Sequence, residues 1–196
     1  GQSGDLSFLV SASAVSGYNY TELREKSILP SEHPNDFIDQ TQIRDNTTFS
    51  LSTNLDYELG KRSSVRFNAL FAEDDDPTEV ERLTVDLRGG GFQHRFERED
   101  IPGTKTNWEV GGDYEFRRDN GDRFKVLAIA NKNDTANTRE RWDIFDDFTE
   151  QKNLFLDTTS ILEERIVRGS YTMDLFNGQD IEIGAERAET ILDSNL

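Results

Sequence analysis

The segment between residues 49 and 71 alternates apolar and polar side chains along two arms, which are joined by a turn at residues 60–63. Odd positions of the first arm are mostly aromatic or aliphatic, and even positions carry Ser, Asn, Asp and Glu. A two-residue period sends these sets to opposite faces of a β-strand, so the segment predicts a hairpin with one apolar and one polar face. Because a slip of one residue would exchange the faces, the register is strongly specified.

The apolar face of such a hairpin has two possible surroundings. In a soluble sandwich it packs inward, whereas in a membrane barrel it faces lipid and the polar face lines a wet interior. Mean hydropathy is −0.74, and the chain has no run of about 18 apolar residues, which excludes a membrane protein made of helices. A β-barrel is not excluded, because its strands need apolar residues only at alternate positions.

Composition removes several other classes. The formal net charge of −17 argues against unassisted nucleic-acid binding, because phosphate contacts need Lys and Arg. The absence of Cys excludes disulfides and thiolate metal sites. An aromatic content of 10%, much of it on a two-residue period, argues against a disordered chain.

Alternation of this kind predicts about nine strands, which form an antiparallel, all-β, up-and-down meander, and no segment shows a clear helical period. The expected strands cover residues 5–15, 47–59, 65–71, 80–87, 92–98, 107–117, 123–130, 161–175 and 180–188. Between them, residues 17–40, 72–78 and 131–160 are charged or contain proline, and we expect loops there. The last of these could instead hold an extended hairpin, or a short helix near residues 143–152.

Connection lengths favour lipid over a buried core. Tight turns are expected at residues 60–63, 88–91, 119–122 and 176–179, and the connections between them are longer and charged. Short turns at one rim and long loops at the other are typical of outer-membrane barrels.

Aromatic residues and strand lengths point the same way. Six rings lie close to the tight turns, as in the aromatic belts of membrane interfaces: Tyr57, Tyr114, Phe116, Phe124, Tyr171 and Phe176. The segments 47–59 and 161–175 exceed the length of about 9–11 residues that a tilted membrane strand needs. We therefore expect part of a transmembrane outer-membrane β-barrel. The alternative is a soluble secreted or periplasmic all-β module that binds carbohydrate or protein.

Residues 1–196 are expected to form one partial barrel domain. The chain begins within a strand-like pattern and stops without a closing signal, which predicts an internal piece of a longer chain. Nine up-and-down strands would also leave a parallel seam on closure, so further strands are expected.

Three stretches resemble barrel strands of TonB-dependent outer-membrane receptors: LSTNLDYELGKRSSVRFNALFAEDDD, GGDYEFRRDNGDRFKVLAIA and IVRGSYTMDLFNGQDIEIGAERAETILDS. The resemblance covers most of the chain and lies in the recurring order of polar-lumen strand, short turn and rising strand. It implies a barrel of about 22 strands around an N-terminal plug. It further implies the outer membrane as location, the lipid bilayer, the plug and a TonB-type energy-coupling protein as partners, and import of a scarce small ligand such as a metal chelate.

No enzymatic chemistry is expected. His33 and His94 are the only histidines and have no metal-ligand spacing, and the chain contains no nucleophile-elbow, zinc-protease or P-loop motif. We expect no catalytic residue, no resident metal and no cofactor. Ligand contacts are expected from the long loops, at Asp74, Asp75, Asp76 and Trp142; the three aspartates could also hold Ca²⁺ through carboxylate oxygens.

Overall fold

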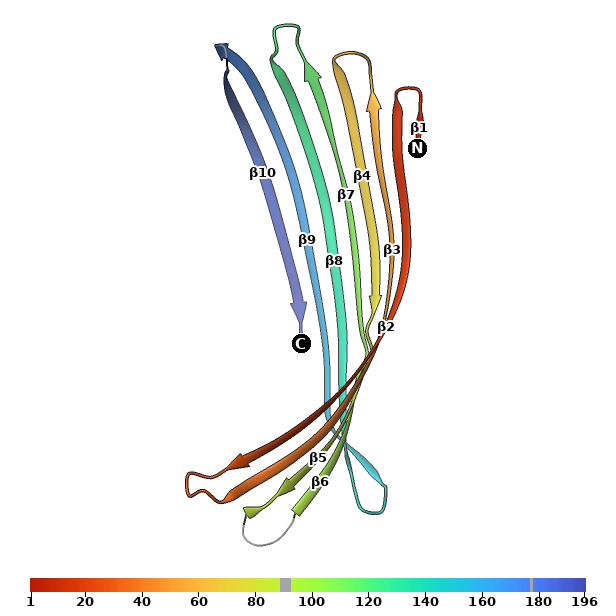
Figure 1. Cartoon of the computed structure of the whole chain (residues 1–196), viewed down its shortest axis with the longest axis vertical. Helices are drawn as coiled ribbons and strands as arrows, with labels where there is room; N and C mark the ends of the chain where they lie inside the picture. The colour runs from red at the N-terminus through yellow and green to blue at the C-terminus, as the bar shows by residue number, and fades with distance from the viewer. Residues whose placement is uncertain (89–92, 177) are drawn as a thin grey trace.

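The computed structural model describes residues 1–88, 93–176 and 178–196, and these residues form a single antiparallel β-sheet (Figure 1). Its strands are β1 (Gln2–Ser3), β2 (Leu6–Ile28), β3 (Pro34–Glu58), β4 (Ser63–Asp75), β5 (Thr78–Asp86), β6 (Gln93–Ile101), β7 (Gly103–Arg117), β8 (Arg123–Ile144), β9 (Glu150–Phe176) and β10 (Gln179–Asn195). No helix in this part of the chain is long and apolar enough to cross a membrane. The predicted all-β antiparallel meander is confirmed.

Two pairs of strands each act as one long strand. β4 and β5 both pair with β3, β4 along residues 47–58 and β5 along residues 36–44. On the other side, β7 and β6 both pair with β8, along residues 123–137 and 140–144. The sheet therefore consists of seven long strands in chain order, preceded by the short β1.

Prolines cause both interruptions. Pro77 separates β4 from β5 and Pro102 separates β6 from β7, because proline has no N–H to donate to a strand ladder. The carbonyls of both prolines still accept backbone hydrogen bonds, from Asp45 at 3.2 Å and from Thr138 at 3.1 Å. Neighbouring strands are therefore still hydrogen-bonded to each other at both proline breaks.

Short connections occur at both ends of the sheet. Residues 59–62 and 118–122 join strands at one end, and residues 29–33 and 145–149 join them at the other (Figure 1). The expected contrast between tight turns at one rim and long loops at the other is therefore wrong. The predicted turn at residues 88–91 falls largely outside the described residues, as does residue 177 of the turn at 176–179. β5 ends and β6 begins at the end of the sheet opposite to residues 59–62.

The three predicted loops are strands. Residues 17–28 and 34–40 belong to β2 and β3, residues 72–75 belong to β4, and residues 131–144 and 150–160 belong to β8 and β9. Their backbones are hydrogen-bonded to neighbouring strands on both sides or at one edge. Both faces carry polar side chains, together with exposed apolar ones such as Leu23 and Phe155. Of the possibilities for residues 131–160, the extended hairpin is confirmed and the short helix is wrong.

One predicted turn forms as its chemistry requires. Residues Arg118 to Asp122 close a hairpin in which the Arg118 N–H donates to the Asp122 carbonyl at 2.8 Å, and Gly121 has φ +94°. Glycine takes this left-handed conformation without the steric cost of a Cβ.

A hydrophobic core between two layers does not exist in the described residues. The sheet is one layer, and Val80 is the single buried hydrophobic residue there. A soluble sandwich would enclose the apolar side chains with a second sheet, and this part of the chain contains no second sheet.

The two edge strands of the sheet run in the same direction. Because seven long strands, like the nine expected, are an odd number, β2 and β10 point the same way (Figure 1), and direct pairing of these two edges would be parallel.

Candidate functional site

The cross-strand register joins the apolar residues of successive strands into one surface. In one row, Leu55 pairs with Phe67, Phe67 with Gly112, Gly112 with Ala128, and Ala128 with Val167. The next row towards the turns is also free of charge, whereas the next row away from them runs through Val110 and Ala130 to Arg165 of β9. We call this surface the apolar belt; its members include Phe8, Val10, Leu51, Leu55, Tyr57, Val65, Phe67, Ala69, Phe71, Trp108, Val110, Tyr114, Phe116, Phe124, Val126, Ala128, Ala130, Val167, Tyr171, Met173, Ile181 and Ile183.

The apolar belt is open and the opposite face is crowded. Phe67 and Phe124, in the middle and at the turn end of the belt, are 41% and 42% exposed. On the polar face, the side chains of Asp113 and Glu115 are only 13% and 11% exposed, although both carry charge. Crowding of one face is expected on the inner side of a curved sheet, where side chains converge, so the polar face is the inner one.

Aromatic rings border the apolar belt at both ends. Tyr114 and Phe124 lie near its turn end, and Phe71 and Trp108 lie at its far end, where they form a cross-strand pair. From Trp108 to Phe116 along β7 is roughly 26 Å of strand. The apolar band of an outer-membrane barrel is about 25 Å tall, and its tilted strands need somewhat more length to cross it.

Charged residues replace apolar ones beyond the far border. Trp108 pairs with Lys132, and Lys132 with Glu163, on the face that carries the belt. From there the strands continue far past the belt, for example to Ile144 in β8 and Pro34 in β3. The sheet therefore has an apolar part next to the tight turns and a polar extension at the other end.

A polar hollow of about 350 Å³ lies on the inner face where the extension begins; it is lined by Arg44, Asn46, Asp74, Asp76, Gly103, Thr104, Lys105, Thr135 and Asn137. Asp74 accepts a hydrogen bond from the Thr48 hydroxyl at 2.6 Å. Asp76 is ion-paired with Arg44, and hydrogen bonds from Arg44 lower the pKa of the Asp76 carboxyl. Amide, hydroxyl and charged groups of both signs make this hollow suited to a polar ligand with several hydrogen-bonding groups.

The four predicted ligand residues do not form one site. The structure brings Asp74 and Asp76 together in the polar hollow, while Asp75 alternates to the other face of β4. Trp142 lies in β8 on the belt side, with the Arg98 guanidinium 4.2 Å from its ring centre. None of the four is on a long loop. Across residues 1–88, 93–176 and 178–196, no three His or acidic side chains are placed to share a metal ion.

A cluster of buried charges on the extension was not predicted. Glu97 and Glu99 of β6 are 7% and 4% exposed on the inner face, and Arg139 donates to Glu99 at 2.5 Å. Arg95 donates to Asp143 at 2.7 Å, and this hydrogen bond lowers the pKa of the Asp143 carboxyl. The sequence carried one signal for this cluster. Acids alternate in β6 and arginines alternate in β8, and oppositely charged residues favour pairing of two strands.

The tip of the β8–β9 hairpin presents aromatic side chains. Phe148 is 88% exposed and has φ +64°, a left-handed conformation that a bulky residue rarely adopts. Phe145 and Phe148 line a hollow of about 670 Å³ together with Phe96.

No protein-family model matches the chain, and no curated protein matches it. Among solved structures, a chain from the FpvAI–pyocin S2 complex is 6% identical, with a TM-score of 0.32 over 95% of this chain and 38% of the other. BauA, the ferric preacinetobactin receptor from Acinetobacter baumannii, is 9% identical, with a TM-score of 0.26 over 96% of this chain and 42% of the other. The chain thus spans less than half the length of either.

Proposed function

We propose that this chain forms part of the wall of an outer-membrane β-barrel, with the apolar belt against lipid and the polar face around an aqueous interior. The observation that carries the proposal is the open apolar belt, which extends over all the long strands and which no other described element covers. Soluble monomers rarely expose contiguous apolar patches above a few hundred Å². The aromatic borders and the height of the belt support the same environment.

Hydrogen bonding sets a further requirement for such a wall. Lipid cannot satisfy backbone N–H and C=O groups, so a membrane sheet must close on itself. In the described residues β10 pairs only with β9, and β2 pairs beyond β3 only with the two residues of β1. Because β2 and β10 run the same way, closure with antiparallel neighbours needs an odd number of additional strands.

We further propose that the barrel is a receptor of the TonB-dependent class that imports a scarce ligand such as a metal chelate. The resemblance of the three sequence stretches supports this class, and so do the long polar extension and the polar hollow on its inner face. The partners would be the remainder of the barrel, a plug and a TonB-type energy-coupling protein. A test is binding of the intact protein in detergent to an immobilised TonB carboxy-terminal domain, and lack of binding would contradict the receptor class but not the barrel.

The two tryptophans allow a direct test of the barrel. Trp108 lies at the far border of the apolar belt, and its partner position in β8, Lys132, is ten residues before Trp142. The two rings are therefore roughly 33 Å apart along the strands. We expect brominated lipids to quench Trp108 in a Trp142→Phe variant and to leave Trp142 unquenched in a Trp108→Phe variant. Equal quenching of both, or of neither, would contradict the orientation.

A further inference from the structure

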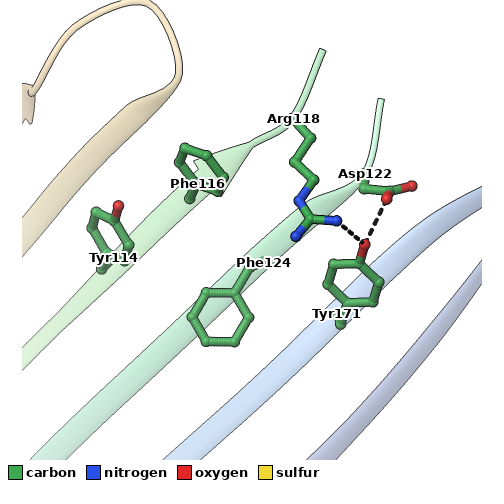
Figure 2. A pocket seen from close by; sticks show the side chains of 6 residues that line it. All are labelled: Tyr114, Phe116, Arg118, Asp122, Phe124 and Tyr171. Carbon is green, nitrogen blue, oxygen red and sulfur yellow. Dashed lines mark hydrogen bonds between the residues drawn. The ribbon is translucent and has the colours of Figure 1, made fainter. Parts of the chain in front are cut away.

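A hollow of about 340 Å³ lies at the turn end of the apolar belt (Figure 2). Its walls are the rings of Tyr114, Phe116, Phe124 and Tyr171, and Arg118 and Asp122 of the β7–β8 turn line it as well. We call it the rim hollow. It combines four aromatic walls with one side chain of each charge.

Two hydrogen bonds connect the polar groups that line the rim hollow (Figure 2). The Tyr171 hydroxyl donates to the Asp122 carboxylate at 2.5 Å, and Nη1 of Arg118 donates to the same hydroxyl oxygen at 3.5 Å. Since the Tyr171 O–H points to Asp122, the lone pairs of the hydroxyl oxygen are left to accept from Arg118. The chain of hydrogen bonds from Arg118 through Tyr171 to Asp122 therefore positions the guanidinium beside the rings.

Most N–H donors of the Arg118 side chain have no partner in the described part of the chain. It forms no ion pair with any residue in the described part of the chain, whereas Arg62 of the neighbouring turn is paired with Asp119. A guanidinium carries five N–H donors in a planar fork that matches the oxygens of a phosphate group. The single hydrogen bond to Tyr171 leaves the others open to an acceptor from outside the chain.

We propose that the rim hollow binds the phosphodiester of a membrane glycerophospholipid, with Arg118 on the phosphate and the aromatic rings around the glycerol and the first acyl carbons. This inference rests on the proposed function, because Tyr114, Phe124 and Tyr171 belong to the apolar belt. The belt ends at these residues, which is the level at which lipid headgroups begin. Aromatic rings and arginine are both stable there, since each has an apolar part and a polar end.

A lipid fits the rim hollow better than a free phosphate ion does. The walls are four rings, which gain contact with hydrocarbon and gain nothing from a hydrated ion. One exposed arginine near a carboxylate is also a weak site for an ion in water. The occupant must therefore carry its phosphate on an apolar body.

Native mass spectrometry of the intact protein in detergent tests the proposal. We would add phosphatidylglycerol, a diacylglycerol without phosphate, or inorganic phosphate, and measure the retained adduct. The wild type is expected to retain phosphatidylglycerol alone. Arg118→Gln should lower retention about tenfold, because a charge-assisted hydrogen bond is lost. Tyr171→Phe, which removes the positioning hydroxyl, should lower it less.

Arg62→Gln is the matched control, because Arg62 lies at the same rim but does not line the hollow. Its retention should equal that of the wild type. Equal losses in Arg62→Gln and Arg118→Gln, equal retention of diacylglycerol, or displacement of the lipid by inorganic phosphate would each overturn the proposal. Quenching of Trp108 by brominated lipid, measured in bilayers on the Trp142→Phe variant, separates this failure from failure of the barrel itself.

Discussion

Arg44 of β3 and Asp76, the residue at the break between β4 and β5, form a two-pronged ion pair in which Arg44 Nε lies 2.5 Å from Asp76 Oδ1. The pair crosses the sheet where Pro77 removes a ladder donor. It therefore ties together two strands at a point where the backbone has one hydrogen bond fewer than usual.

The first prediction concerns the pH dependence of this junction. The hydrogen bonds from Arg44 lower the pKa of Asp76 below its value in an unfolded chain, about 3.9. A lowered folded-state pKa gives stability that is present above the unfolded pKa and is lost as pH falls through the folded pKa. We expect the protection factors of the amides near residues 74–78, which correct for the intrinsic pH dependence of exchange, to fall below about pH 4 in the wild type. In Asp76→Asn they should already be low at pH 7. Asp75→Asn is the control, and equal exchange in both variants would contradict the role of the pair.

The second prediction places a charge inside the apolar belt, two residues from its far border. Val110→Arg should destabilise the protein in bilayers by about 1–3 kcal/mol, because the arginine would face hydrocarbon between the membrane interface and the midplane. Ser52→Arg, on the polar face, should cost less than about 1 kcal/mol. Urea unfolding in lipid vesicles measures both. A soluble module would reverse the expectation, since Val110→Arg would then reduce an exposed apolar patch.

The alternating residues between 49 and 71 were enough to predict which side chains of that hairpin share a face, and the structure pairs two of the apolar ones, Leu55 and Phe67. Here the two faces differ in polarity, so the two-residue period is visible in the sequence. The turn at Gly121 could be predicted for a separate reason, because few residues adopt positive φ.

The extension could not be predicted in the same way. Residues 131–144 carry polar groups on both faces, so nothing in their order distinguishes a strand from a loop. Their state is decided by hydrogen bonds to β7, β6 and β9, partners that are distant in sequence. For the same reason Glu99 and Arg139, forty residues apart, were not recognised as a pair.

The third prediction concerns strain at the β8–β9 tip. Phe148 takes a left-handed conformation and is largely exposed, so replacement by glycine should relieve backbone strain and remove little packing. We expect Phe148→Gly to raise the free energy of unfolding by about 1 kcal/mol. Asp147→Ala should lower it, because Asp147 accepts hydrogen bonds from the Thr149 N–H at 3.1 Å and hydroxyl at 2.6 Å. Local amide exchange at the tip reports both changes, and a less protected tip in Phe148→Gly would show that the phenyl ring stabilises the turn.

The last prediction separates charge pairing from simple burial at Glu99. The Glu99 carboxylate is almost fully enclosed and receives a hydrogen bond from Arg139, so Arg139→Gln should leave a buried charge with a weaker partner. The loss should be about 2 kcal/mol, in the range measured when a charged hydrogen bond is broken and one partner stays buried. Glu99→Gln combined with Arg139→Gln should recover more than half of it, because a neutral amide needs no counter-ion. If the double variant is as unstable as the sum of the two single ones, the residues act independently, and the role of the pair is contradicted.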